Sequence, residues 1–303
     1  MRFIGCALAW RPGEAEDRTS CLVVLDERGS LVANSFAGSL GEISSSIEGY
    51  AAERAGVLVG LDAPLSVPNQ RGTRSVERIL SKVALPAYSA SRKMFGEGPT
   101  YAEELLAGLE KVGVEYTDYP FQRVRGQRVA VEVDTAATLK VLTYERGRAR
   151  DNKRNGRRGR RQEESGEEAQ NPEQELRALQ DLKFRKGKKE ARAAAIKEAV
   201  DTLWNTPGLR LRTAGLAADL DAPENVDLSR LDVTPELSHA QMDRIVSLIE
   251  GTLAAYTVHR HWKGRDGSIV VGTGSEGYVL LPAAKPLHDR IAEECRVAKV
   301  PYV

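Results

Sequence analysis

The sequence predicts an α/β protein with a mixed central sheet flanked by helices and interrupted by one charged insertion. Three observations support this class. Short apolar runs with a turn between them open the chain, a longer apolar run ends in Asp62, and amphipathic helical patterns alternate with the strands. The 303 residues are 41% hydrophobic, which is enough to form the core of one large domain or two small ones.

Net charge and cysteine content narrow the class of protein only slightly. The chain carries 44 basic and 43 acidic side chains, so the net charge of +1 names no partner. Cys6, Cys21 and Cys295 lack paired or metal-ligand spacing, so we expect reduced thiols in a cytoplasmic protein. The apolar run from Phe3 to Trp10 is too short to cross a membrane, and we expect a buried strand and no membrane partner.

The first part of the chain predicts three antiparallel strands, a helix and a central strand. The three strands are expected at residues 3–10, 21–25 and 30–36. Ser39 and Glu42 form a capping box that begins a helix, and Gly56 ends it. The continuous apolar run at 57–62 is typical of a central strand whose carboxyl end opens onto a site, and it places Asp62 at that end.

A second strand and helix precede an abrupt change in composition. Residues 129–133 predict a strand with Glu132 near its end, followed by a helix from Ala136 to about Glu145. Nine Lys or Arg then occur by Arg161, and an acidic, Gln-rich stretch follows. We therefore assign residues 1–145 and 236–303 to the core, 146–188 to a charged and mobile insertion, and 189–235 to a helical extension and connection.

The C-terminal part predicts a long helix and a hairpin. Ser238 and Gln241 form a second capping box, so Asp243 falls in the opening turns of this helix. The hairpin is expected at residues 268–271 and 278–281. Three hairpin strands, a helix, a strand and then strand and helix pairs is the order of the ribonuclease H fold, so we predict a ribonuclease-H-like α/β fold.

Three acids fall at the predicted ends of strands or the start of a helix. A single acid at such a position is usually exposed or caps a helix. Asp62, Glu132 and Asp243 together form a chemically sensible ligand set, because Mg²⁺ and Mn²⁺ prefer oxygen ligands. The set predicts a divalent-metal site. In a two-metal mechanism, the ions at such a site generate hydroxide, orient it and stabilise the leaving oxygen of a phosphodiester.

The chain resembles the domain of unknown function 429 family, whose members are regarded as ribonuclease-H-like nucleases. The resemblance spans most of the chain and rests on the segments Phe3 to Trp10, Gly60 to Leu65, Glu132-Val133 followed by Ala136 to Leu139, Met242-Asp243 and Glu276 to Pro282. It implies the ribonuclease-H-like fold, a divalent-metal site and phosphodiester hydrolysis. Matching positions imply that Asp62, Glu132 and Asp243 are the metal ligands.

The departures from the family pattern concern the predicted catalytic site. Ala7 occupies the position where the family has Asp, which removes a central ligand; Thr135, Ala240 and Arg244 also differ. We therefore expect impaired cleavage and at most one weakly held Mg²⁺ or Mn²⁺. Two explanations stay open: natural loss of catalysis with retained binding, or a deliberate Asp-to-Ala change that traps uncut substrate. The three persisting acids favour a once-active site disabled at one position.

Nucleic acid is the predicted partner. Following Asp62, the resemblance places substrate-facing groups at Arg71, Arg74, Arg78, Tyr88, Arg92 and Lys93. The basic run from Arg146 to Arg161 either follows a phosphate backbone or is a solvated linker. The main alternative is a catalytically silent nucleic-acid-binding protein. A phosphotransfer enzyme of the same broad fold is disfavoured, because Gly272 to Ser275 lacks the Gly-Lys-Ser/Thr ending of a phosphate loop.

Overall fold

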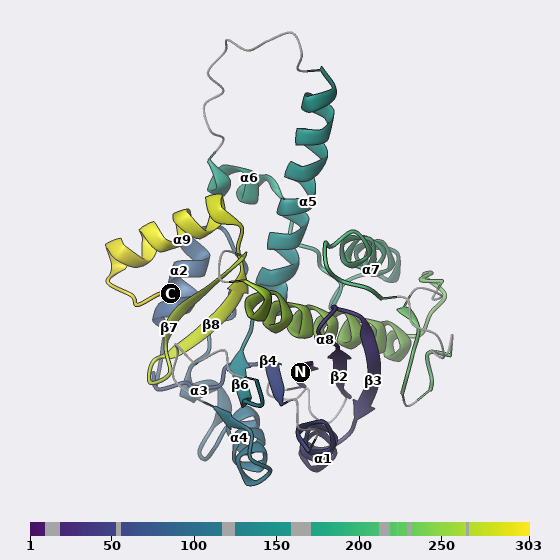
Figure 1. The fold of residues 1–303 in the computed structure, drawn as a ribbon, viewed down its shortest axis with the longest axis vertical. Helices are drawn as coiled ribbons and strands as arrows, with labels where there is room; N and C mark the ends of the chain where they lie inside the picture. Colours follow the sequence, from purple (N-terminus) through teal and green to yellow (C-terminus); the bar gives the residue numbers. More distant parts are fainter. Residues whose placement is uncertain are drawn as a thin grey trace.

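A computed structural model describes residues 1–9, 19–52, 56–116, 125–158, 171–211, 219–222, 224–228, 232–264 and 267–303. Its central sheet has six strands in the order β3-β2-β1-β4-β6-β5 (Figure 1). The strands are β1 (Arg2–Ala7), β2 (Ser20–Leu25), β3 (Leu31–Ala37), β4 (Val57–Asp62), β5 (Glu115–Tyr116) and β6 (Arg128–Glu132). The first three pair in antiparallel fashion, whereas β4 pairs in parallel with β1 and β6, and β6 in parallel with β5. The prediction of a mixed central sheet is confirmed.

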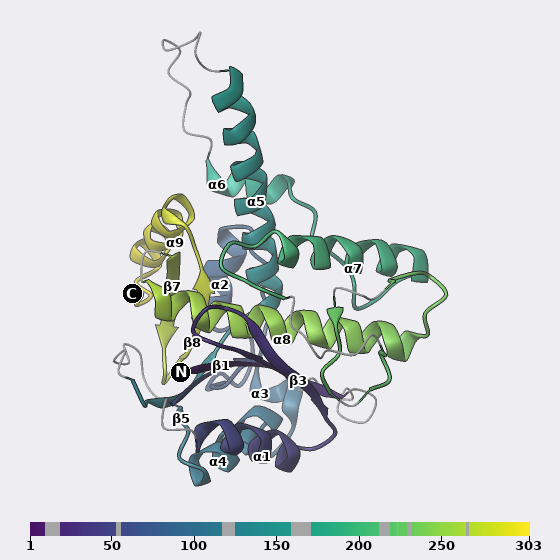
Figure 2. The ribbon, with the colours of Figure 1, turned by 45° about the vertical axis from the view of Figure 1, so that its right-hand side comes forward.

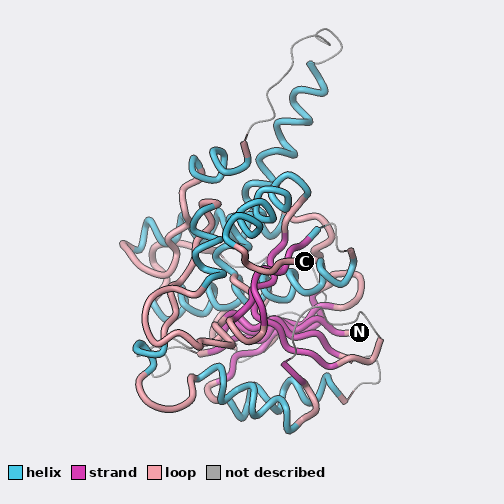
Figure 3. The backbone as a smooth tube through the Cα atoms, turned by 90° about the vertical axis from the view of Figure 1, so that its left-hand side faces the viewer, coloured by secondary structure: helices cyan, strands magenta, loops and turns pink. Residues whose placement is uncertain are grey.

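Helices lie on both faces of this sheet (Figure 3). They are α1 (Leu40–Ala51), α2 (Ser75–Lys82), α3 (Arg92–Phe95), α4 (Tyr101–Lys111), α5 (Thr135–Arg158), α6 (Pro172–Ala178), α7 (Lys189–Trp204), α8 (His239–Lys263) and α9 (Lys285–Ala298). A separate antiparallel hairpin consists of β7 (Ser268–Thr273) and β8 (Gly277–Pro282). Within the described residues, no helix combines the length and apolar character needed to cross a membrane.

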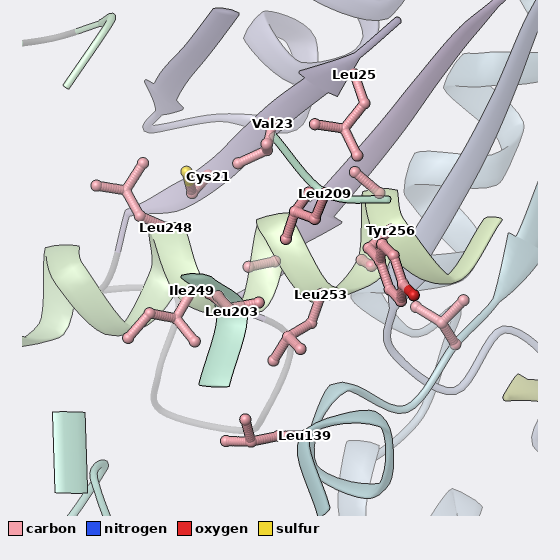
Figure 4. Close-up of a cluster of buried hydrophobic side chains, with 14 of the residues drawn as sticks. Cys21, Val23, Leu25, Leu139, Leu203, Leu209, Leu248, Ile249, Leu253 and Tyr256 are labelled. Atoms are coloured by element: carbon pink, nitrogen blue, oxygen red, sulfur yellow. The ribbon is translucent and has the colours of Figure 1, made fainter. Parts of the chain in front are cut away.

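The two faces of the sheet bury different helices (Figure 2). Helices α1 and α4 cover one face, with Ile43, Ile47 and Leu105 in its core. Helix α8 covers the other, with Leu248 of α8 toward Cys21 of β2 (Figure 4). Helices α7 and α5 pack on the far side of α8, where Leu253 lies toward Leu139 of α5. The core between α8 and the sheet and helices around it includes Ile245, Ile249 and Leu253 of α8, which recur at helical spacing in the sequence.

Helix α8 approaches the sheet closely because glycines line the contact. A Cβ atom at Gly5 of β1 would lie 1.9 Å from the carbonyl oxygen of Gly251 in α8. One at Gly60 of β4 would lie 2.8 Å from the carbonyl oxygen of Ala254. Larger side chains at these positions would therefore force the helix away from the sheet. This close packing fixes where α8 presents its polar residues at the end of the sheet.

The described ends of the charged region contain helix that its composition does not predict. Helix α5 does not end near Glu145 but continues to Arg158. Arg146 and Arg148 make ion pairs with Asp201 and Glu175, at 2.6 and 3.3 Å. Beyond residues 159–170, which lie outside the described residues, Leu176 of α6 is fully buried. Most described residues of the predicted insertion over 146–188 are exposed or half-buried, but Leu176 and Phe184 are buried, so its described ends contact the body of the protein.

A third apolar core joins the hairpin to the rest of the molecule. It contains side chains from α2, α5, α6, α9 and both hairpin strands, among them Leu80, Leu176 and Leu281. The three cysteines, including Cys295 in this core, are buried and form no disulfide. The hairpin and α2 thus cover the carboxyl end of β6 from one side, which determines how the acids there are exposed.

Candidate functional site

Ala7 and Asp62 lie side by side where two parallel strands end. They are register partners of β1 and β4, and the face of β4 that carries Asp62 also carries Gly60, which faces α8. Asp62 is mostly buried, with 14% of its side chain exposed. A carboxylate at position 7 would share this face, because register neighbours of paired strands point to the same side of a sheet.

The first residue of α5 holds the Asp62 carboxylate. The backbone N–H of Thr135 donates to Oδ1 at 3.1 Å, and its hydroxyl donates to Oδ2 at 2.7 Å. A proline at position 135 would have no backbone N–H to donate. Thr135 therefore gives Asp62 two hydrogen bonds, and the negative charge of Asp62 lies at the N-terminus of a helix.

Asp134 is a second acid at this helix start, and the sequence reasoning missed it. Its Oδ1 accepts a hydrogen bond from the backbone N–H of Ala137 at 2.8 Å, as an N-capping residue does. Loss of solvent around the partly buried carboxyl, together with the charge of Asp62, raises its pKa to about 7. Asp134 therefore changes its protonation near neutral pH, which an ordinary capping Asp does not.

Glu250 on α8 and Arg185 complete the group. Glu250 is buried, with 2% of its side chain exposed, and pairs with the Arg185 guanidinium at 2.5 Å. The same guanidinium lies 3.7 Å from Oδ2 of Asp62. Arg185 belongs to the segment between α6 and α7, and 25% of its side chain is exposed. A cation supplied by the protein thus lies between two of the acids.

These side chains line a pocket of about 450 Å³. Its polar lining includes Asp62, Asp134, Thr135, Arg185 and Glu250. Its other lining residues are Pro86, Ala87, Tyr88, Ala136, Leu182, Lys183, Phe184 and Lys186. The volume falls in the range of about 300–1,000 Å³ that small-molecule sites occupy. The arrangement combines acids in the interior, exposed lysines and an apolar wall.

Glu132 does not join this pocket, which corrects its prediction as a ligand. Its register partner is Leu61, which belongs to the core under α1 and α4, so Glu132 points away from the face of Asp62. Arg74 donates to both its oxygens, from Nη2 at 2.6 Å and from Nη1 at 3.0 Å. The backbone N–H of Leu65 donates to Oε2 at 2.8 Å. These bonds occupy the carboxylate.

Arg74 is buried as well, which corrects its prediction as a nucleic-acid contact. It is 5% exposed, and it also donates to Glu77 at 2.7 Å and to the Ser66 carbonyl at 3.0 Å. Burial opposes its charge, but Glu132 and Glu77 outweigh this effect and raise the pKa of the guanidinium. A Cβ atom at Gly277 of β8 would lie 2.7 Å from Nη1. The hairpin therefore closes over this ion pair.

Asp243 also lies apart from the pocket, which corrects its prediction as a ligand. It comes seven residues before Glu250 on α8, or about 10 Å at a rise of about 1.5 Å per residue. Its carboxylate pairs with Arg192 of α7 at 2.7 Å. The sequence thus selected the correct helix and about the correct face of it, but a position two turns too early.

The other predicted nucleic-acid contacts fall into three groups. Tyr88 lines the pocket. Arg71, Arg78 and Lys93 are exposed, whereas Arg92 forms an ion pair with Glu103. Helix α5 projects outward from the body of the protein (Figure 1), and Arg150 on this helix is 62% exposed. Basic groups therefore remain available on the surface, although Arg74 and Arg92 are used internally.

The acids of the pocket do not form a ready metal site. In the part of the chain that the structure describes, no group of three or more His, Cys, Asp or Glu side chains is arranged to hold a metal ion. The contacts explain this result. Both oxygens of Asp62 accept hydrogen bonds from Thr135, and Glu250 pairs with Arg185. The donor set as it stands therefore does not fit a divalent cation.

Comparisons with known proteins add no relative. No family model matches the chain, and no curated protein or solved structure matches it. The resemblance to the domain of unknown function 429 family therefore stays a prediction from the quoted segments.

Proposed function

We propose that the protein binds nucleic acid at the pocket between β4, α5 and α8, and that it does so without a resident metal. The observation that carries this proposal is the pocket segment with Lys183, Arg185 and Lys186, whose two lysines are exposed. Lysine and arginine side chains neutralise phosphates, and the released counterions drive binding. Arg185 also supplies a positive charge among the acids, where a ribonuclease-H-like nuclease would need a cation.

The order of the elements supports a ribonuclease-H-like fold for this proposal. Three antiparallel strands form one side of the sheet, and β4 and β6 continue it in parallel with β1. Substrates of open α/β sheets usually bind beyond the carboxyl ends of the central parallel strands. The pocket is at this end, because Asp62 is the last residue of β4 and Asp134 lies just after β6.

The test is the salt dependence of binding to fluorescein-labelled DNA and RNA, measured by anisotropy. Lys183→Ala/Lys186→Ala should weaken binding and reduce the slope of log K against log[salt] by about one unit per lysine. Lys111→Ala/Lys263→Ala is the matched control, because both lysines are exposed and neither lines the pocket. Equal effects of the two pairs, or no binding by the unmodified chain, would refute the proposal.

A metal-dependent nuclease is the second candidate, and the convergence of Asp62, Asp134 and Glu250 on one pocket favours it. For this candidate, Ala7→Asp should produce cleavage in Mg²⁺ or Mn²⁺. A restored interaction of several kcal/mol corresponds to a rate gain of about a thousandfold or more. Ala7→Asp with Asp62→Asn controls for contaminating nuclease. If Ala7→Asp leaves single- and double-stranded DNA and RNA uncut, this candidate fails.

A further inference from the structure

One side of the pocket is apolar, and neither the acids nor the lysines explain this wall. Pro86, Ala87, Leu182 and Phe184 line it, and Tyr88 contributes an aromatic ring. A smaller cavity of about 100 Å³ shares Pro86, Ala136, Leu182 and Phe184 with it, so the apolar surface continues beyond the main pocket. A phosphate group alone gains nothing from such a surface. A flat ring gains buried area against it.

The wall is held in place before any ligand arrives. The carbonyl oxygen of Phe184 accepts a hydrogen bond from Nε of Arg192 at 2.9 Å, and Arg192 is buried. Asp181 in the same segment pairs with Lys140 of α5 at 2.7 Å. Arg185 is held by Glu250. A preformed wall costs little conformational entropy on binding, which is what a selective site needs.

The polar groups of the same lining define the rest of the ligand. The carboxylates of Asp62, Asp134 and Glu250 accept hydrogen bonds, so they favour a ring that carries N–H donors. Lys183 and Lys186 are exposed beside them and favour a phosphate outside the pocket. A ring with N–H groups joined to a phosphate is a nucleotide.

We propose that the pocket takes one unstacked nucleotide, with its base against Leu182 and Phe184 and its phosphate at Lys183 and Lys186. This inference deepens the proposed nucleic-acid binding and rests on it for the source of the nucleotide. A paired base inside a duplex cannot enter a pocket, because its faces are covered by its neighbours. The protein therefore selects single-stranded over double-stranded nucleic acid, since aromatic and apolar side chains stack on exposed bases.

The experiment compares four probes by anisotropy or competition: a single-stranded oligonucleotide, the same strand with abasic sites, a blunt duplex, and adenosine monophosphate. The single strand should bind about 5- to 150-fold more tightly than the abasic strand and the duplex, since one stacked base contributes about 1–3 kcal/mol. Leu182→Trp, which fills the pocket, should remove this preference and keep the salt-dependent part of binding. Lys111→Ala should change neither the preference for the single strand nor the salt-dependent part of binding.

A second measurement does not depend on the folding of a variant. A strand containing 2-aminopurine becomes more fluorescent when that base leaves the stack, so binding to the unmodified chain should increase its emission. Equal affinity for normal and abasic strands, with unchanged emission, would overturn the pocket assignment while nucleic-acid binding stood. Binding of adenosine monophosphate without any strand would support the pocket and overturn the proposed partner. Failure of all four probes would overturn both.

Discussion

Two clusters of arginine and carboxylate lie at the same end of the sheet, and they differ in how they meet solvent. In one, Arg74 pairs with Glu132 and Glu77, and the side chains of all three are at most 4% exposed. In the other, Arg185 lies between Glu250 and Asp62, and it is 25% exposed. The first cluster is on the face of Leu61, and the second is on the opposite face.

The difference separates a structural role from a candidate functional one. Arg74 directs its guanidinium nitrogens to two carboxylates and a backbone carbonyl, and the β7–β8 hairpin covers it. A saturated and buried ion pair has no site left for a ligand. Arg185 instead lines a pocket with Asp134, whose pKa is raised to about 7. Perturbed acids in an open cleft are the usual mark of a functional site.

The largest expected effect is on stability. If it were absent, the Arg74 cluster would not have the structural role assigned to it. Arg74→Met leaves Glu132 and Glu77 buried without a counter-charge, which should lower the free energy of unfolding by about 3–5 kcal/mol. Arg185→Met should cost less than half as much, because water can enter the pocket to solvate Glu250. Urea unfolding monitored by circular dichroism measures both. Similar losses for the two variants would mean that the Arg185 cluster is as structural as the Arg74 cluster.

The two clusters also differ in how well local sequence patterns predict their residues. The element order, the mixed sheet and the position of Asp62 at a strand end follow from local patterns of apolar residues. Glu132 and Asp134 look equivalent in such a pattern, because both are acids near the end of one strand. They differ because Glu132 still pairs within the sheet and points to its far face, whereas Asp134 lies beyond the last paired residue.

The rest of the site depends on packing that no local pattern specifies. The position of α8 along the sheet is fixed by close contacts such as that of Gly251 with Gly5, and these contacts place Glu250 rather than Asp243 at the pocket. Arg185 lies in a Lys-rich stretch that looks like part of a linker. The one signal there was the apolar pair Leu182 and Phe184 on either side of Lys183, which marks a segment that packs rather than one that is only solvated.

A metal-binding experiment would sharpen the comparison, and its expected effect is intermediate. Ala7→Asp adds a carboxylate on the face of Asp62, and Arg185→Met removes the cation that lies between Asp62 and Glu250. The double variant should bind Mn²⁺ at least about tenfold more tightly than the unmodified chain, which is about 1.4 kcal/mol. Electron paramagnetic resonance of free Mn²⁺ measures this difference without any substrate.

The control for this experiment is the same double variant with Asp62→Asn, which should lose the gain. A second control combines Ala7→Asp with a substitution in the Arg74 cluster. Arg74→Met in place of Arg185→Met should create no Mn²⁺ site, because Glu132 points to the other face of the sheet and lies under the hairpin. Tighter Mn²⁺ binding by the Arg74 variant would show that the two clusters are not distinct in function.

The smallest expected effect is on the pH dependence of stability, and it concerns only the pocket that Arg185 and Asp134 line. Because the pKa of Asp134 is raised to about 7 from its ordinary value of 3.8, the native state holds this proton more tightly than the unfolded chain does. Its contribution to stability is therefore present at low pH and is lost as the pH rises from about 4 to about 7.

Asp134→Asn removes this loss and keeps the helix cap, since Asn caps as well as Asp. The variant should gain on the order of 1 kcal/mol over the unmodified chain at pH 8, after allowance for solvent screening, and less at pH 5. Thermal or urea unfolding at the two pH values measures the difference. An equal gain at pH 5 and pH 8 would mean that the pocket does not hold Asp134 in its protonated form. The Arg185 cluster would then lack the perturbed acid that most distinguishes it from the Arg74 cluster.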